Sequence, residues 1–220
     1  MFRKLFNQLR KMVSESSSFN ASHFNDPVAT QTSWTPLKSG GSNFKTHKLV
    51  QVNSNRIEFK ASLGAKLFYF IFFIAGIGAM IAFSYPKFES GDFGINMESI
   101  MPLLIGLGFS IAGGVMLYFG TTPIVFDKRN KSFWKGRKSP NMVYRKKELK
   151  TYVSLKDIHA IQLISEYISG NKSSYYSYEL NLVLKDARRI NVIDHGSKTK
   201  VRENAQTLSK FLDVSVWDAI

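Results

Sequence analysis

Two histidines and one carboxylate are the residues whose types could support catalysis in this chain. Asp194 and His195 end a predicted strand just before Gly196, and His159 lies in another predicted strand. A catalytic histidine needs a nucleophile or a second base within hydrogen-bond reach. No serine stands in a recognisable nucleophile motif, and the chain has no cysteine. We therefore predict no catalytic residue, and we interpret Asp194 as a turn or capping residue.

The other histidines and the tryptophans form no pattern that would bind a metal or a cofactor. His23 and His47 have no second ligand at a useful spacing, and the lack of cysteine excludes a thiolate site. Trp34, Trp134 and Trp217 are more typical of core or interface positions than of a ligand cage. We predict no cofactor and no metal site.

Basic residues in the second half of the chain form the strongest charge pattern. The formal net charge is +14, and ten lysines and arginines lie between residues 128 and 150. Beside an anionic leaflet each such charge contributes about 1 kcal/mol to binding. The alternative is a solvated basic face that follows the charge bias of membrane proteins, and we predict no nucleic-acid binding. The predicted lipid-binding residues are Lys128, Arg129, Lys131, Lys135, Arg137, Lys138, Arg145, Lys146, Lys147 and Lys150.

Three tyrosines form a second predicted contact surface. Tyr175, Tyr176 and Tyr178 follow the polar loop GNKSS at the start of a predicted strand. Exposed tyrosine is common at protein interfaces. We predict that these three side chains bind a protein partner.

Two long apolar segments must position these residues. About 20 predominantly apolar residues cross a ~30 Å hydrocarbon core, and residues 66–84 and 99–120 are therefore predicted to be transmembrane helices. Residues 1–65 carry a net charge of +6, residues 121–220 carry +9, and the connecting loop 85–98 carries −2. Lys and Arg are enriched on the cytoplasmic side of membrane proteins. We therefore expect a multi-pass protein of the bacterial inner (cytoplasmic) membrane, with both termini in the cytoplasm and the loop in the periplasm.

Small residues form a stripe on each apolar segment. Their spacing places them on one helical face, where helix backbones can approach closely within lipid. We expect the two faces to meet within the chain; the alternative is that one of them joins two copies into a homo-oligomer. Neither segment has an ionisable residue in its middle, which argues against a transporter or channel formed by this chain alone. The predicted helix-packing residues are Ala75, Ala79, Ala82, Gly106, Ser110 and Gly114.

The residues before the first apolar segment divide into three parts. Residues 1–13 predict an amphipathic basic helix, which lies either on the membrane surface or against the chain's own domain. Residues 14–47 are rich in Ser, Thr and Asn and predict a linker. Residues 48–61 predict a β-hairpin, which is marginal alone in water. We therefore expect this hairpin to join the cytoplasmic domain at residues 121–220, so that the membrane hairpin interrupts one domain.

The strand pattern predicts an α+β membrane protein. Seven antiparallel strands are expected, followed by an amphipathic helix that Ser197 caps. The segments IVFDKRNKSFWKG, LKDIHAIQLISEY and YELNLVLKDARRINVID, followed by this helix, resemble uncharacterised bacterial two-span inner-membrane proteins with a cytoplasmic PH-like domain. The resemblance covers residues 121–218 and implies a PH-like barrel without enzymatic activity. The predicted strands are 48–52, 56–61, 122–127, 132–136, 157–167, 177–185 and 188–194.

These patterns together predict a non-catalytic integral membrane protein. Its PH-like domain is expected to bind a protein partner, anionic membrane lipid, or both at the inner leaflet. One alternative is an immunity protein that neutralises a membrane-acting bacterial toxin, because small, basic, multi-span proteins without active sites suit that role. Another is a subunit of a membrane enzyme or transporter, which would need polar groups within the bilayer or converging acid–base groups.

Overall fold

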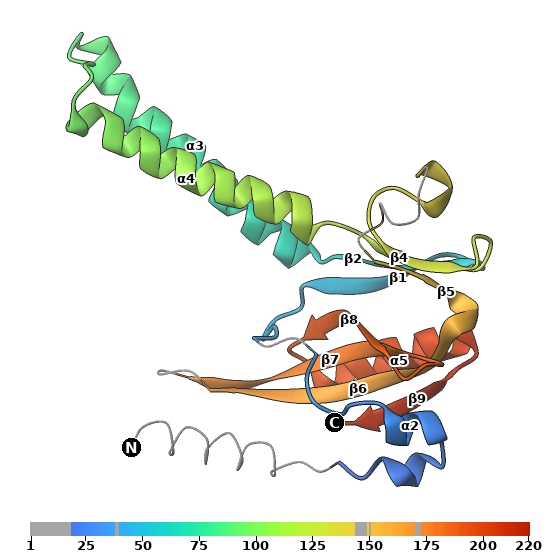
Figure 1. Cartoon of the computed structure of the whole chain (residues 1–220). Helices are drawn as coiled ribbons and strands as arrows, with labels where there is room; N and C mark the ends of the chain where they lie inside the picture. The colour runs from blue at the N-terminus through green and yellow to red at the C-terminus, as the bar shows by residue number, and fades with distance from the viewer. Residues whose placement is uncertain (1–18, 38–39, 144–148, 150, 170–172) are drawn as a thin grey trace.

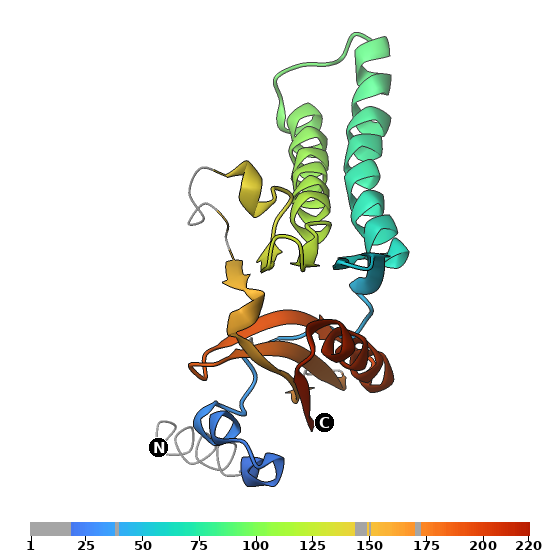
Figure 2. The same cartoon turned by 90° about the vertical axis from the view of Figure 1, so that its right-hand side faces the viewer.

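Two long helices project from a β domain of two layers, and the N-terminal segment lies on the far side of the second layer (Figures 1 and 2). The predicted helix at residues 1–13 and the predicted lipid-binding residues Arg145, Lys146, Lys147 and Lys150 lie outside the described residues. The computed structural model describes residues 19–37, 40–143, 149, 151–169 and 173–220.

The two helices, α3 (Leu63–Glu89) and α4 (Met97–Gly120), are long and apolar enough to cross a membrane. Only 6% and 11% of the residues in their most apolar stretches are buried, so neither is a core helix of the β domain. α3 continues past the predicted end at Ser84, and the connecting loop is therefore shorter than predicted. The chain leaves the helix only near Gly91, whose φ of +76° is a left-handed conformation typical of helix ends.

Small residues bring the two helices into backbone contact. A Cβ atom placed on Gly76 of α3 would lie 2.5 Å from the Gly106 carbonyl oxygen and 2.4 Å from Ser110 Oγ. Gly106 and Ser110 are buried in this contact, as the spacing on the second segment predicts. Gly114 is only half-buried, and its neighbour Gly113 faces α3 in its place.

The predicted stripe on α3 does not make this contact. Ala75 and Ala82 are exposed, and Ala79 is half-buried. Residue spacing finds the small side chains that share a face, but the rotation of the helix depends on where the partner allows the closest approach. Gly76 has no side chain at all, so the helices meet there.

Sheet A continues directly from both helices. β2 pairs with β3 in antiparallel orientation, with Phe59 opposite Ile124. The helical hairpin is therefore an insertion between neighbouring strands of one sheet, which is the arrangement that the strand pattern predicts. The strand order is β1–β2–β3–β4–β5, with β1 (His47–Asn53), β2 (Arg56–Ala61), β3 (Ile124–Asp127), β4 (Ser132–Lys135) and β5 (Thr151–Ser154).

Sheet B is a mixed sheet. β6 pairs antiparallel with β7 and parallel with β9. A parallel partner needs a crossover connection, and α5 (Lys198–Leu212) carries the chain across from β8 to β9. Ser197 Oγ accepts the Lys200 N–H, as expected of the predicted cap. The strand order is β8–β7–β6–β9, with β6 (Ile158–Ser169), β7 (Ser174–Leu184), β8 (Arg189–His195) and β9 (Ser215–Ala219).

The described residues form nine strands, so the prediction of seven antiparallel strands is wrong in two places. β5 lies between the predicted strands 132–136 and 157–167, and no tight turn joins it to its partner β4 to mark it as a strand. The prediction placed all strands before the C-terminal helix, but β9 comes after it. Its pairing with β6 is parallel and joins distant segments, which leaves no local turn signal in the sequence.

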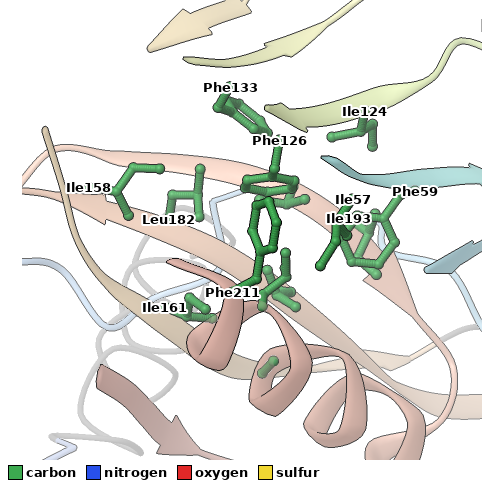
Figure 3. Packing of buried hydrophobic residues seen from close by; sticks show 14 of the residues in the cluster. Ile57, Phe59, Ile124, Phe126, Phe133, Ile158, Ile161, Leu182, Ile193 and Phe211 are labelled. Atoms are coloured by element: carbon green, nitrogen blue, oxygen red, sulfur yellow. The ribbon is translucent and has the colours of Figure 1, made fainter. Parts of the chain in front are cut away.

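The core lies between the two sheets, and α5 closes it on one side (Figure 3). Successive residues of a strand point to opposite faces, so alternate side chains of both sheets point inward. Phe126 and Phe133 of sheet A pack with their ring centroids 4.8 Å apart, and Phe211 of α5 points toward them. Burial of each large apolar side chain contributes about 1.5–3 kcal/mol. The cluster therefore joins both sheets and α5 in one domain.

Residues 19–37 and 40–46 form an N-terminal strap across the outer face of sheet B (Figure 1). This part of the predicted linker is therefore not a free connection. The strap contains η1 (Ala21–Phe24) and α2 (Pro27–Gln31). The rings of Phe24 and Trp34 stack 5.4 Å apart, and their centroids lie 5.8 and 5.9 Å from that of the buried Trp217.

Polar side chains on the outer face of sheet B bond to the strap backbone. The buried Glu179 carboxylate accepts the Leu37 N–H at 2.9 Å. Gln162, also buried, donates its Nε2 to the Ser33 carbonyl at 3.0 Å. Buried polar groups need such partners, and the strap supplies them. The strap is therefore part of the folded domain.

Candidate membrane-facing site

The structure does not bring the residues that could do acid–base chemistry together. β7 lies between β8, which carries His195, and β6, which carries His159. Across β7, the residue of β6 that lies level with His195 is Ser165, because Tyr178 pairs with both. His159 lies six residues before Ser165, at the start of β6, so the two histidines are not neighbours. His159 Nε2 instead contacts the carboxylate of Asp26 in the strap at 2.7 Å.

Asp194 and His195 have structural contacts. Asp194 accepts a hydrogen bond from Asn191 Nδ2 at 2.8 Å. His195 is buried, and its Nδ1 accepts the Ser197 N–H at 2.8 Å, at the start of α5. Burial and the nearby charges of Lys45 and Lys200 lower the pKa of His195. Within the described ranges, no three His, Asp or Glu side chains gather in a way that could hold a metal ion.

Five of the six described basic residues that the sequence predicts as lipid ligands separate into two groups, and the sixth, Lys135, ends β4 and bonds to Val192 of β8. Lys128, Arg129 and Lys131 lie in the β3–β4 turn, at the end of β3 away from the helices, and Lys128 Nζ lies 4.7 Å from the Phe211 ring centroid. Arg137 and Lys138 follow β4 and return to the helix end of sheet A. A single basic patch is therefore not formed.

Arg137 is fixed at the end of α4. Its guanidinium donates to the Tyr118 carbonyl at 2.9 Å and to Thr121 Oγ1 at 2.7 Å, and it lies 5.2 Å from the Tyr118 ring centroid. The carbonyl end of a helix carries partial negative charge, which this cation complements. The neighbouring Lys138 is exposed.

Lysines from the start of α3 and from β1 and β2 lie at the same end of the molecule. Ser62 links them, because it caps α3 and its Oγ donates to the Lys45 carbonyl at 2.7 Å. Lys48 and Lys60 are opposite each other in β1 and β2. Lys66 is exposed in the first turn of α3. We call this set the juxtamembrane collar: Lys45, Lys48, Lys60, Lys66, Arg137 and Lys138.

The side chains of Lys48 and Lys60 lie on the outer face of sheet A, because their neighbours Leu49 and Phe59 pack into the core. Figures 1 and 2 show that this face is turned toward the side from which the helices project. Lys60 Nζ lies 3.3 Å from the buried Glu58 carboxylate. Sequence reasoning missed these lysines because they are scattered singly in strands, although their nearness to an apolar segment was a usable signal.

A pocket of about 800 Å³ lies at the feet of the helices, between sheet A and the edge strand β8. Tyr69 of α3 and Lys135 of β4 are among its lining residues, and Lys135 Nζ donates to the Val192 carbonyl at 2.9 Å. His47 also lines the pocket. Burial and the charges of Lys135 and His195 lower the pKa of His47 to about 4, so His47 is neutral at pH 7.

The three predicted partner-binding tyrosines have different surroundings. Tyr178 packs against the core. Tyr175 donates its hydroxyl to the Gly41 carbonyl at 3.1 Å and is half-buried. Tyr176 is 54% exposed, and its ring lies 5.1 Å from that of Tyr167, which is 59% exposed. Sequence reasoning missed Tyr167, although the cross-strand pairing of alternating strands could have suggested it.

What this arrangement can do chemically follows from its charges and its position. It places cations and aromatic rings around the feet of two exposed apolar helices, where an anionic surface could bind. A scan against protein-family models finds no match to the chain, and searches of curated proteins and of solved structures find no similar protein.

Proposed function

We propose that this chain is a non-catalytic integral protein of the bacterial inner membrane whose β domain binds anionic lipid at the inner leaflet. The observation that carries the proposal is the juxtamembrane collar at the feet of α3 and α4. Each lysine or arginine beside an anionic leaflet contributes about 1 kcal/mol, with Lys60 contributing less because Glu58 neutralises part of its charge. Their sum is enough to hold the β domain against the membrane that the helices cross.

The charge distribution supports the orientation in this proposal. The flanks of the helical hairpin are basic, and the segment between the two apolar stretches is acidic. Because cationic flanks stay in the cytoplasm, both termini and the β domain are cytoplasmic. A reporter fused after Ile220 should be active only when it matures in the cytoplasm. Activity of a reporter that requires the periplasm would contradict the orientation.

We also infer that the β domain is PH-like. Two packed sheets, with a helix that follows the antiparallel strands and covers the core, support this description. The parallel strand β9 after α5 departs from an arrangement that ends with the helix. The inference therefore concerns the two sheets and α5, and β9 is an addition to them.

Lipid selectivity tests the proposed function directly. The full-length chain is reconstituted into bilayers that contain spin-labelled phosphatidylglycerol or spin-labelled phosphatidylcholine, and the motionally restricted fraction of each lipid is measured by electron paramagnetic resonance. We expect preference for the anionic lipid. Replacing four collar lysines by glutamine should remove most of it; these are Lys45, Lys48, Lys60 and Lys66.

A matched control variant removes the same number of positive charges, but at positions away from the collar. It replaces four exposed basic residues elsewhere on the domain by glutamine, and the preference for phosphatidylglycerol should survive. Equal restriction of both lipids by the unaltered chain, or equal loss in both variants, would overturn lipid binding by the collar. The residues of the matched variant are Arg129, Lys156, Lys185 and Lys210.

A further inference from the structure

The β6–β7 hairpin extends beyond the rest of sheet B. β9 pairs with β6 only from Ala160 to Ile164, and β8 pairs with β7 only from Tyr178 onward. The ends of both strands, residues 165–169 and 174–177, therefore form a two-stranded projection that we call the β6–β7 arm. In Figure 1 the arm extends toward the side to which the helices lean.

The strap occupies one face of this arm. Glu166 accepts the N–H groups of Gly40 and Gly41, each at 3.2 Å. A Cβ atom on Gly41 would lie 2.2 Å from Ser177 Oγ, so the strap backbone lies directly against β7. The hydroxyl of Tyr175 closes the contact from the same strand. These bonds brace the arm and hold its position relative to the domain.

The opposite face of the arm carries the exposed tyrosine pair. Tyr167 and Tyr176 are direct cross-strand partners, and such pairs on one face of a sheet interact. Along β7 the same face carries Tyr178 and Leu180, which pack into the core beneath sheet A. Beyond the core this face is uncovered, and it is turned toward the side from which the helices project (Figure 1).

We propose that the Tyr167–Tyr176 pair is a second membrane contact, which inserts into the headgroup region of the leaflet that the helix feet cross. This inference rests on the proposed function. Tyrosine is enriched at both membrane–water interfaces because its ring is apolar and its hydroxyl remains hydrated. The occupant is a lipid surface because the bilayer that surrounds α3 and α4 continues outward from their feet over the face that the arm presents.

A leaflet perpendicular to the helices is inclined to the sheets, because the helices lean toward the arm (Figure 1). The arm lies on the side where the domain comes nearest to such a leaflet. Contacts at the helix feet and at the arm, two separate points on the domain, would together fix the tilt of the domain relative to the leaflet.

Single-cysteine labelling tests the position of the pair, since the chain has no cysteine of its own. An environment-sensitive fluorophore is attached to Tyr176→Cys in proteoliposomes, and quenching by a lipid with a nitroxide near its headgroup is compared with quenching by aqueous iodide. We expect strong lipid quenching and several-fold weaker iodide quenching than at Gln206→Cys, an exposed position on α5. A label at Leu107→Cys, in α4, serves as the reference within the bilayer.

The Leu107 label distinguishes failure of the arm contact from failure of membrane insertion. If the Leu107 label is quenched from within the bilayer while the Tyr176 label is as open to iodide as the Gln206 label, the arm does not touch lipid and the inference is overturned. If the Leu107 label is itself quenched by iodide alone, the proposed membrane insertion fails, and the inference fails with it.

A second variant tests whether the tyrosine rings make the contact. The label is placed at Ser173→Cys near the arm's tip, first with both tyrosines present and then with Tyr167→Ser and Tyr176→Ser together. Both rings are largely exposed, so the fold should tolerate their loss. Lipid quenching at position 173 should fall several-fold without the rings. Unchanged quenching would show that the tyrosines do not anchor the arm.

Discussion

The helical hairpin and the β domain achieve close packing in opposite ways. In the β domain, large side chains fill the space between elements, and Trp134 and Trp217 are almost completely buried. In the hairpin, close contact depends on the absence of side chains, because α3 and α4 meet at Gly76 and Gly106. Large-to-small substitutions should therefore destabilise the β domain, and small-to-large substitutions should destabilise the hairpin.

The proposed membrane location of the hairpin accounts for the difference. In water, burial of apolar area drives folding and favours large side chains. In lipid the hydrocarbon tails are as apolar as leucine, so helix association depends on close van der Waals packing. The described residues show both strategies: glycine contacts between two exposed apolar helices, and large buried side chains in the β domain. Each strategy can be tested by the kind of substitution that the other tolerates.

The largest expected effect is in the β domain. Trp217→Ala removes the ring that Phe24 and Trp34 of the strap cover, and it should lower the free energy of unfolding by about 4 kcal/mol. Urea unfolding of the full chain in detergent, followed by circular dichroism, measures this loss. The strap should also become sensitive to limited proteolysis.

Trp134→Ala is the matched control on sheet A. Trp134 is equally buried but packs with Val125 and Leu149, away from the strap. Trp134→Ala should lower the free energy of unfolding by a similar amount, while the strap stays protected from protease. Equal protease sensitivity in both variants would contradict local packing of the strap on Trp217.

The second expected effect is in the hairpin. Gly76→Ile adds a side chain where a Cβ atom already lies 2.5 Å from the α4 backbone, and overpacking of this kind costs about 3 kcal/mol. Gly78→Ile is the control, since a Cβ at Gly78 has no neighbour within 4 Å. Unfolding in mixed detergent micelles should separate the variants. The steric explanation is wrong if Gly78→Ile destabilises the hairpin as much.

The third effect is pH dependence, which should arise in the β domain because residues 67–84 and 99–120 contain no ionisable side chain except tyrosine. Burial and the charges of Lys135 and His195 lower the pKa of His47 from 6.5 to about 4. Between pH 6.5 and 4 the unfolded chain therefore binds a proton that the folded chain does not. Acidification through this range should lower the free energy of unfolding by roughly 2 kcal/mol.

His47→Gln should remove most of that loss, whereas His23→Gln, at an exposed position, should leave it unchanged. Unfolding curves at pH 7 and at pH 4.5 provide the measurement. His195 acts in the same direction, because burial lowers its pKa too, so a small residual dependence is expected. A full acid effect in His47→Gln would assign the dependence to other groups.

The smallest expected effect concerns the strap. Glu179→Gln keeps the shape of a buried side chain but weakens its hydrogen bonds from Leu37 N–H and Asn181 Nδ2, at a cost of about 1.5 kcal/mol. Hydrogen exchange at the Leu37 amide should become faster. Glu166→Gln, at a half-buried position, should have less effect on stability. Unchanged exchange at Leu37 would show that the charge of Glu179 does not hold the strap.

Local patterns in the sequence were enough to predict much of the fold. The two apolar helices, the alternating strands and the Ser197 cap each depend on residues within one or two turns of chain, so hydropathy and period reveal them. The parallel strand β9 left no such signal, because its partner β6 lies far away in the sequence. Strand β5 was missed because no tight turn links it to β4, whereas the equally short β3 and β4 flank a hairpin turn.

By itself, then, the sequence determined which segments are apolar enough to enter a membrane, where the basic flanks lie, and which stretches alternate as strands. Only the tertiary structure decided that Gly76 and not Ala75 meets α4, that scattered lysines gather as a collar, and that Tyr167 stands beside Tyr176. Composition and period are properties of neighbouring residues. Contacts between distant segments depend on the rotation and register of whole elements, which packing alone selects.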